Sequence, residues 1–319
     1  MRLATIDLGT NSVRLLVADT VGDGWRAVEE GQRVTRLGEG QAATGALGPA
    51  PMARTAATVA DFVRRAKELG ALRVRITATS AVREAANRAE FVALVETVAG
   101  TRLEVLSGED EARLTLLGAR SGLPDLTGRF VLFDIGGGST ELVVADGARL
   151  ERALSLRLGV VSLAERHVDA GPLRPAQWMA LRAEVATALA PAVLAGLGAG
   201  SASVLVGTAG TVTTLAALDL ELPAYDGSRV QGYVLRRDAI ERLLARVGGL
   251  SLAARAALPC LEPGRADVLI PGIAICLAAM EGLGFDALTV SDRSLREGIL
   301  CEILAARGAA PEAPRDPRP

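Results

Sequence analysis

The sequence contains a thirteen-residue segment twice, at a spacing typical of whole domains. The segment Asp7-Leu-Gly-Thr-Asn-Ser-Val-Arg-Leu-Leu-Val-Ala-Asp19 aligns without gaps on Asp134-Ile-Gly-Gly-Gly-Ser-Thr-Glu-Leu-Val-Val-Ala-Asp146. Seven of the thirteen positions are identical, and the copies start 127 residues apart. In each copy an apolar run ends in Asp, a short Gly-rich polar turn follows, and a second apolar run begins, as in a β-hairpin. We therefore expect a duplicated domain in which each half opens with a hairpin.

Around the hairpins, the sequence patterns predict alternating strands and helices, which is the order of an α/β fold. In the first half we expect strands at 2–7, 13–19, 25–36, 73–78 and 103–106, and helices at 51–69, 88–99 and 109–121. In the second half we expect strands at 129–134, 140–146, 149–155, 203–206 and 287–290, and helices at 161–168, 175–195, 211–218, 237–247, 252–258, 265–282 and 294–306. The turn-rich residues 121–128 predict the junction, which gives domains of residues 1–124 and 125–307. The proline-rich residues 308–319 predict a disordered tail.

The composition limits the chemistry that is available to this chain. Half of its 319 residues are hydrophobic, so it can bury a large core, and its net charge of −2 argues against binding to nucleic acid or an anionic membrane. His167 is the single histidine, which excludes histidine-rich metal centres. The chemistry must therefore depend on carboxylates, hydroxyls, arginines and backbone amides.

The cysteines and the apolar segments indicate a cellular compartment. Cys260, Cys276 and Cys301 match no zinc or redox spacing, and an odd, sparse count suits a reducing environment. The first residues contain no apolar region of the signal-peptide type. The charge-free run 185–218 is interrupted by Pro191 and several glycines, so we expect no membrane span. These features predict a cytoplasmic protein.

The two hairpin turns, at 9–12 and 136–139, are candidate anion sites because successive backbone N–H groups can surround an anion. They differ from Walker A and dinucleotide-binding loops, in which the glycines lead into a helix rather than a strand. Asp7 and Asp134 end the preceding strands and would face the same cleft, where they could hold a hydrated Mg²⁺, and Glu141 could join them. Alternatively, each aspartate accepts hydrogen bonds from its own turn.

Three further segments have both a functional and a structural interpretation. In Gly207-Thr-Ala-Gly210-Thr211 the amides at a helix start could bind phosphate, or Thr211 is simply the N-cap. The acids at 109–111 either favour the dipole of a helix start, or one of them faces the cleft as a base. Arg83 follows a strand that ends in hydroxyl residues, and it either binds phosphate or is solvated.

Taken together, these motifs resemble the exopolyphosphatase/guanosine pentaphosphate phosphohydrolase (Ppx/GppA) phosphatase family. The resemblance covers nearly the whole chain in order. It is carried by Asp7-Leu-Gly-Thr-Asn-Ser, Arg36-Leu-Gly-Glu-Gly, Thr79-Ser-Ala-Val-Arg, Ser107-Gly-Glu-Asp-Glu-Ala-Arg-Leu, Asp134-Ile-Gly-Gly-Gly-Ser-Thr-Glu-Leu, Gly207-Thr-Ala-Gly-Thr, Asp267-Val-Leu-Ile-Pro-Gly and Ser291-Asp-Arg-Ser-Leu-Arg-Glu-Gly.

The resemblance implies two ribonuclease-H-like domains of the actin-like, sugar-kinase and chaperone-ATPase superfamily around an interdomain cleft. It implies that Glu111 is the general base and that Asp134 and Glu141 hold magnesium and phosphate, with Asp7 at the equivalent place in the first hairpin. The residues that it implies around the substrate phosphates are Asn11, Ser12, Arg83, Gly137, Gly138, Ser139 and Gly210.

The resemblance also implies a reaction: an Mg²⁺-dependent exopolyphosphatase that releases orthophosphate from the ends of inorganic polyphosphate. The alternatives are a guanosine pentaphosphate phosphohydrolase, a non-catalytic polyphosphate- or alarmone-binding regulator, and a kinase-like phosphotransferase, for which no adenosine pocket is identified. Long family members carry a C-terminal histidine/aspartate-rich domain that has no counterpart in this sequence, so we expect short substrates. The family further suggests a homodimer.

Overall fold

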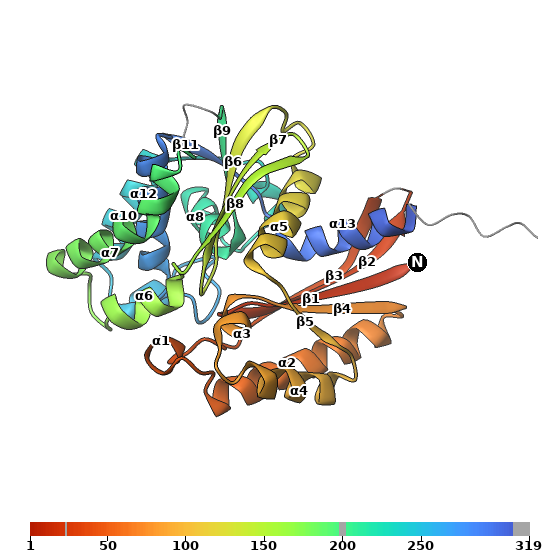
Figure 1. Ribbon diagram of the computed structural model, residues 1–319. Helices are drawn as coiled ribbons and strands as arrows, with labels where there is room; N and C mark the ends of the chain where they lie inside the picture. The colour runs from red at the N-terminus through yellow and green to blue at the C-terminus, as the bar shows by residue number, and fades with distance from the viewer. Residues whose placement is uncertain (23, 198–201, 309–319) are drawn as a thin grey trace, which may run out of the picture.

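The computed structural model describes residues 1–319 except 23, 198–201 and 309–319, and it is built around two mixed sheets (Figure 1). The first sheet has the order β3-β2-β1-β4-β5. In it, β1 and its two hairpin partners are antiparallel, whereas β4 and β5 continue parallel to β1. Its strands are β1 (Arg2–Leu8), β2 (Ser12–Val21), β3 (Gly24–Val34), β4 (Arg73–Ala78) and β5 (Leu103–Val105).

The second sheet repeats this order and adds one strand. Its order is β10-β11-β9-β6-β7-β8, with β6, β7 and β8 antiparallel and β9 and β11 parallel to β6. The strands are β6 (Arg129–Ile135), β7 (Thr140–Asp146), β8 (Arg149–Leu156), β9 (Val204–Thr208), β10 (Val234–Arg236) and β11 (Ala287–Val290). The predicted duplicated α/β fold is therefore confirmed at the level of strand order.

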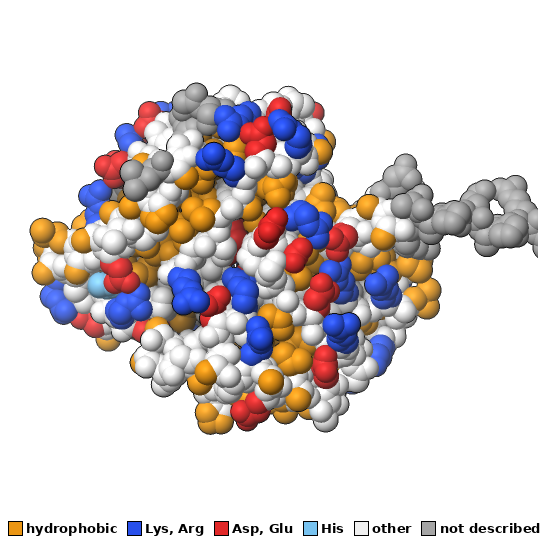
Figure 2. Space-filling view, viewed as in Figure 1, with side chains coloured by type: hydrophobic (Ala, Val, Ile, Leu, Met, Phe, Trp, Pro, Cys, Tyr) orange, Lys and Arg blue, Asp and Glu red, His pale blue; other side chains and the backbone are white. Residues whose placement is uncertain are grey.

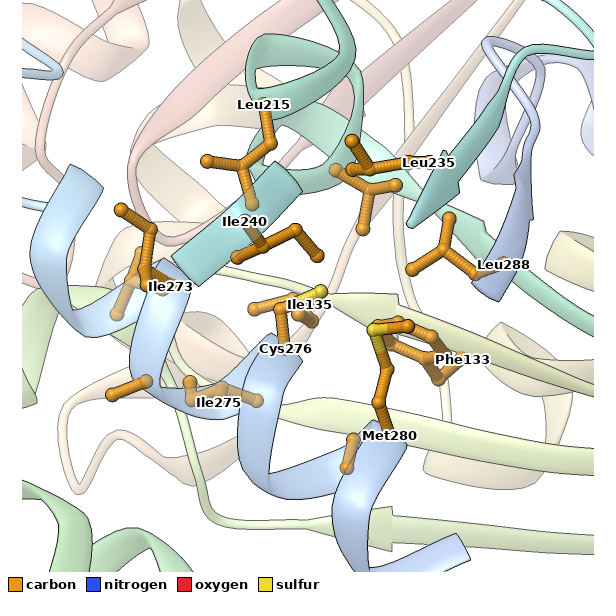
Figure 3. Close-up of a cluster of buried hydrophobic side chains, with 14 of the residues drawn as sticks. Phe133, Ile135, Leu215, Leu235, Ile240, Ile273, Ile275, Cys276, Met280 and Leu288 are labelled. Carbon is orange, nitrogen blue, oxygen red and sulfur yellow. The ribbon is translucent and has the colours of Figure 1, made fainter. Parts of the chain in front are cut away.

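Helices cover the outer face of each sheet. The first sheet packs against α2 (Pro49–Glu68) and α4 (Arg88–Ala99) through an aliphatic core. The second packs against α6 (Val160–His167), α7 (Pro175–Leu194), α8 (Ala209–Asp219), α10 (Arg237–Gly248) and α12 (Leu269–Leu283). Figure 3 shows the centre of this second core, where Phe133 of β6 lies near Met280 and Cys276 of α12. Cys276 is buried, Cys260 and Cys301 are half-buried, and all three are free thiols.

Two helices fill the space between the sheets (Figure 1). Helix α5 (Gly108–Gly122) packs on β6 and β7 through Ala112 and Leu116. Helix α13 (Leu295–Gly308), the last of the described helices, returns to the first sheet and packs on β1 and β2. It therefore crosses back to the N-terminal unit.

The predicted strands and long helices are confirmed, with ends that differ by a few residues. The sequence did not indicate α1 (Gln41–Thr44), α3 (Ser80–Glu84), α9 (Gly227–Val230) or β10, all of which are three to five residues long, while α11 (Leu252–Ala256) is shorter than expected.

The domain limits remain a prediction. Residues 309–319 of the predicted tail lie outside the described residues, and Gly308 ends α13. Among the described helices, none is long and apolar enough to cross a membrane.

Candidate active site

The repeated hairpins build two turns of the same geometry. In each turn the first glycine donates its backbone N–H to the carbonyl of the serine that ends the turn, from Gly9 to Ser12 at 3.0 Å and from Gly136 to Ser139 at 2.9 Å. This bond reverses the chain within three residues and leaves the N–H groups in between free to bind an anion.

The two turns lie against each other. A Cβ atom on Gly137 would be 3.0 Å from the backbone nitrogen of Asn11, and one on Gly138 would be 2.5 Å from Oγ1 of Thr10. Side chains at these two positions would push the turns apart. The glycines of the second turn are therefore required for the close approach of the two halves.

A small cavity of about 100 Å³ lies between the turns, α8 and α5. Most of the predicted site residues line it: Asp7, Asn11, Ser12, Glu111, Asp134, Gly137, Gly138, Ser139 and Gly210. The two exceptions, Arg83 and Glu141, do not line the cavity wall but lie close enough to Glu111 to affect its charge. Residues from both sheets, in three separate stretches of the first half and five of the second, thus converge on one cleft.

Asp7 and Asp134 occupy matching positions at the ends of β1 and β6. Loss of hydration is the main cause that raises the pKa of Asp7 to about 6 and that of Asp134 to about 7. The negative charge of Glu141 raises the Asp134 pKa further. The buried Oδ1 atom of Asp7 has no hydrogen-bond partner among the described residues, which argues against the alternative that this carboxylate is satisfied by its own turn.

These carboxylates have the chemistry of a magnesium site without being a preformed one. No three carboxyl, thiol or imidazole side chains of the described residues come together as a metal-binding group. Mg²⁺ usually takes one or two carboxylates and completes its shell with water and substrate phosphates. The unpartnered oxygen of Asp7 and the adjacent carboxylate of Asp134 fit this requirement, so these two residues could hold the ion.

Glu111 is the acid of the 109–111 cluster that faces the cleft. The Ser107 hydroxyl caps α5 by accepting from the Asp110 backbone N–H at 3.0 Å, which starts the helix at Gly108. Glu109 and Asp110 consequently lie on the exposed side, and Glu111 is buried. Burial, followed by the charge of Glu141, raises the Glu111 pKa well above its ordinary value of 4.5.

Arg83 binds this carboxylate rather than the turns. One guanidinium nitrogen donates to Oε2 of Glu111 at 2.8 Å and to the Leu106 carbonyl at 3.1 Å. Its charge and hydrogen bond favour the anionic form of Glu111 and partly oppose the effect of burial. In this arrangement Arg83 orients the acid and does not reach into the cavity.

Gly210 lies in the first turn of α8, whose N-terminus faces the cleft. The helix starts at Ala209, which has a φ of 67°, and Thr208 is its N-cap, so Thr211 lies inside the helix and is not the cap. A Cβ atom on Gly210 would be 1.9 Å from a guanidinium nitrogen of Arg265. Only glycine allows this arginine to lie over the helix start.

Two further arginines, Arg14 and Arg265, line the cleft and are not among the residues predicted from the sequence. Arg14 faces Asp7 across the first hairpin as Glu141 faces Asp134 across the second. Arg14 is thus the counterpart of Glu141 in the repeat, and that alignment was the signal that could have identified it. Arg265 comes from the loop before α12 and has no local signal; burial lowers its pKa to about 10.

A larger cavity of about 570 Å³ adjoins the cleft. The two share Arg14, Gly210 and Arg265 in their walls. The larger cavity also contains the Tyr225 ring and pairs of opposite charge, such as Arg265 with Glu262 and Arg296 with Glu30. On the face of the molecule in Figure 2, basic and acidic side chains are likewise intermixed. A substrate that ends in the cleft therefore has space to extend into a largely charge-balanced chamber.

The duplicated fold, glycine-rich turns and converging carboxylates define a phosphohydrolase of the two-domain α/β class. Residues 16–307 match the model of the Ppx/GppA phosphatase family, and the chain belongs to that family. Its relatives bear the names of phosphoanhydride hydrolases, and the chain is an enzyme of this kind.

Relatives and solved structures agree with this assignment. Exopolyphosphatase 2 of Mycobacterium tuberculosis is 38% identical over 314 residues, which cover 93% of this chain and 97% of that protein. A guanosine-5'-triphosphate,3'-diphosphate pyrophosphatase of Vibrio cholerae is 30% identical over 94% of this chain and 59% of its own length. The crystal structure of a Ppx/GppA family member from Aquifex aeolicus superposes with a TM-score of 0.81 at 30% identity, covering 97% of this chain and 99% of that one. An exopolyphosphatase structure from Cytophaga hutchinsonii gives 0.89 at 26% identity, covering 96% and 98%.

Proposed function

We propose that the protein is an exopolyphosphatase that hydrolyses the terminal phosphate of inorganic polyphosphate. The observation that carries the proposal is the convergence of one buried glutamate, two aspartates and the amides of two glycine turns on a single small cavity. The polyphosphate substrate is supported by the names of the relatives that match along nearly their whole length.

The terminal phosphate is held by backbone amides and hydroxyls. The free N–H groups of the turns at 9–12 and 136–139 and the N-terminus of α8 bind its oxygens from two sides. Arg14 and Arg265, which line both cavities, contact the phosphates that follow. This arrangement fixes the end of the polyphosphate and leaves one face of its terminal phosphorus open towards Glu111.

Glu111 acts as the general base in a single displacement. A water molecule between Glu111 and the terminal phosphorus attacks in line, and its proton passes to the Glu111 carboxylate. The new oxygen–phosphorus bond forms as the bridging anhydride bond breaks, so orthophosphate and a chain shortened by one phosphate leave. Arg83 keeps the carboxylate aimed at the water.

Asp7 and Asp134 hold a magnesium ion, with Glu141 close behind them. When bound, the ion neutralises charge on the phosphate oxygens. The raised pKa values of the two aspartates support this part of the proposal, because burial outweighs the opposing charge of Arg14 at both carboxylates, so a bound cation would favour their ionised forms.

A second substrate, guanosine pentaphosphate, is favoured by the adjoining cavity. In this cavity the charges of Arg265 and Arg296 are balanced by Glu262 and Glu30, so the cavity offers little net positive charge for the further phosphates of a long inorganic polyphosphate. A nucleoside would instead bring a flat, uncharged group to the wall that contains Tyr225.

The test is the release of orthophosphate from polyphosphates of several defined lengths and from guanosine pentaphosphate, with Mg²⁺ or with EDTA. We expect Mg²⁺-dependent release from short polyphosphates. Turnover of the pentaphosphate alone would favour the second substrate. Tight binding of these compounds without turnover would identify a non-catalytic regulator and contradict the proposal.

A further inference from the structure

Glu141 is held from behind by a serine of the neighbouring strand. Ser155 of β8 lies directly opposite Glu141 of β7 in the antiparallel register. Its hydroxyl donates to Oε1 of Glu141 at 2.8 Å. The glutamate is 2% exposed, and a buried carboxylate is stable and well oriented only when donors such as this one satisfy it.

The same serine touches the start of the helix that carries Glu111. A Cβ atom on Gly108, the first residue of α5, would lie 2.8 Å from Cβ of Ser155 and 3.1 Å from its Oγ. Glycine at this position lets the helix start approach β8. Ser155 therefore contacts both the carboxylate of Glu141 and the turn of α5 that places Glu111 in the cleft.

Ser155 itself lies outside the cleft. It lines a separate surface hollow with Gly108 and Glu109 and does not line the cavity between the turns. Any effect of Ser155 on the reaction must therefore pass through Glu141 or α5, because its hydroxyl lies outside the wall that faces the bound phosphate.

We propose that Ser155 is a positioning residue of the phosphohydrolase site, whose hydroxyl fixes the Glu141 carboxylate against α5 and so maintains its placement beside Glu111. The inference rests on the proposed function. This positioning role of Ser155 differs from a role in folding alone, because loss of the hydroxyl removes no apolar contact from the core and leaves the β7–β8 backbone ladder intact.

The test is a double-mutant cycle with Ser155→Ala, Glu141→Gln and the combined variant, measured as orthophosphate release from a polyphosphate that the wild type hydrolyses. We expect Ser155→Ala to lower kcat about tenfold, as loss of an outer partner of a site carboxylate usually does, with KM changed by less than about twofold. In the Glu141→Gln background the same change should have no further effect.

Two variants serve as controls. Ser155→Thr keeps the hydroxyl and should retain kcat within about threefold of the wild type. Ser203→Ala removes an exposed serine just before β9, whose hydroxyl donates to the Arg129 carbonyl at 3.3 Å, and it should leave kcat unchanged. Melting temperatures of all variants separate an effect on folding from one on the site.

The outcomes distinguish the inference from the proposed function. An unchanged kcat in Ser155→Ala, or a full additional loss in the Glu141→Gln background, overturns the role of Ser155 while the function stands. A wild type that releases no orthophosphate from any polyphosphate overturns the function, and the role of Ser155 falls with it.

Discussion

Glu111 and Arg83 form a buried pair in which burial and the arginine act in opposite directions on one carboxyl group. Glu111 is buried in the first turn of α5, and this burial raises the pKa of its carboxyl group. Arg83, which donates to this carboxylate at 2.8 Å, limits that rise. In the proposed mechanism Glu111 must be anionic before it can accept a proton from water, so the pair would control the pH at which the enzyme becomes active.

The first prediction concerns this pair. Arg83→Gln removes a positive charge that favours the anionic form, so the Glu111 pKa should rise further and the acid limb of the kcat profile should move to higher pH. Activity should fall on the acid side of the wild-type optimum and recover partly as the pH is raised. Arg88→Gln, at the exposed start of α4, is the matched control. An acid limb that stays at the wild-type pH would contradict the assignment of Glu111 as the general base.

The second prediction concerns the folding stability of the metal-free protein. The folded-state pKa of Asp134, about 7, lies above its ordinary value of 3.8, so charging this group as pH rises destabilises the fold. In EDTA at pH 8, Asp134→Asn should therefore raise the free energy of unfolding, by up to about 4 kcal/mol for a rise of about three pKa units.

The pH dependence of that gain checks its cause. Urea unfolding at several pH values should show the advantage of Asp134→Asn shrinking as pH falls below 7 and vanishing below about pH 3, where the wild-type carboxyl is protonated in both states. Addition of Mg²⁺ should stabilise the wild type more than the variant. An asparagine variant that is less stable than the wild type at pH 8 would oppose this account.

At the scale of elements, the pair α5 and α13 connects the two sheets. The helices cross at Gly118 and Gly298. A Cβ atom on Gly118 would lie 1.7 Å from the carbonyl oxygen of Ser294, which directly precedes α13, and one on Gly298 would lie 1.7 Å from the carbonyl oxygen of Leu114 in α5. This close crossing joins the helix that carries Glu111 to the start of α13, where Ser294 and Leu295 line the cleft.

The third prediction tests the crossing. Gly118→Ala places a methyl group against backbone that cannot rotate away, and it should lower the free energy of unfolding by about 3 kcal/mol. Gly122→Ala, on the same helix, meets only the side chains of Arg293 and Gln231, which can move, and should cost about 1 kcal/mol or less. Urea denaturation measures both. Equal effects of the two substitutions would show that the crossing is not tight.

The elements also show how far sequence reasoning extends. The hairpins could be predicted because each apolar run alternates with a Gly-rich turn and the pattern occurs twice. Short elements such as β10 could not, since three residues carry no periodicity. The return of α13 to the first sheet depends on Gly118 and Gly298 meeting across 180 residues, and no local pattern encodes such a contact. Likewise Arg265 reaches the cleft only through the packing of its loop over Gly210.

At the scale of the whole molecule, polar contacts join the two halves at the rim of the cleft. The segment after β3 is paired with the second half through Arg36 and Asp267 and through Gly40, whose N–H donates to Glu165 of α6 at 2.9 Å. Two of the family motifs in the sequence, those that start at Arg36 and Asp267, therefore meet in one ion pair across the cleft. These contacts hold the halves in the arrangement in which the hairpin turns touch.

The fourth prediction concerns this closure. Asp267→Asn removes the ion pair and should raise KM for polyphosphate less than about tenfold with little change in kcat, because a half-exposed pair contributes only about 1 kcal/mol. The radius of gyration from solution scattering should increase slightly. Asp61→Asn, whose partners Arg33 and Arg64 lie in the same half, is the control. A larger fall in kcat than rise in KM would place Asp267 in the chemical step instead.

The central claim, that Glu111 activates the attacking water, is tested most directly by kcat for orthophosphate release in Glu111→Gln. The amide keeps the shape of the side chain and cannot accept the proton, so the account predicts a fall in kcat of about 100-fold or more with an unchanged circular dichroism spectrum. Glu109→Gln, two residues earlier on the exposed side of α5, should retain wild-type turnover. Turnover near the wild-type rate in Glu111→Gln would contradict the account.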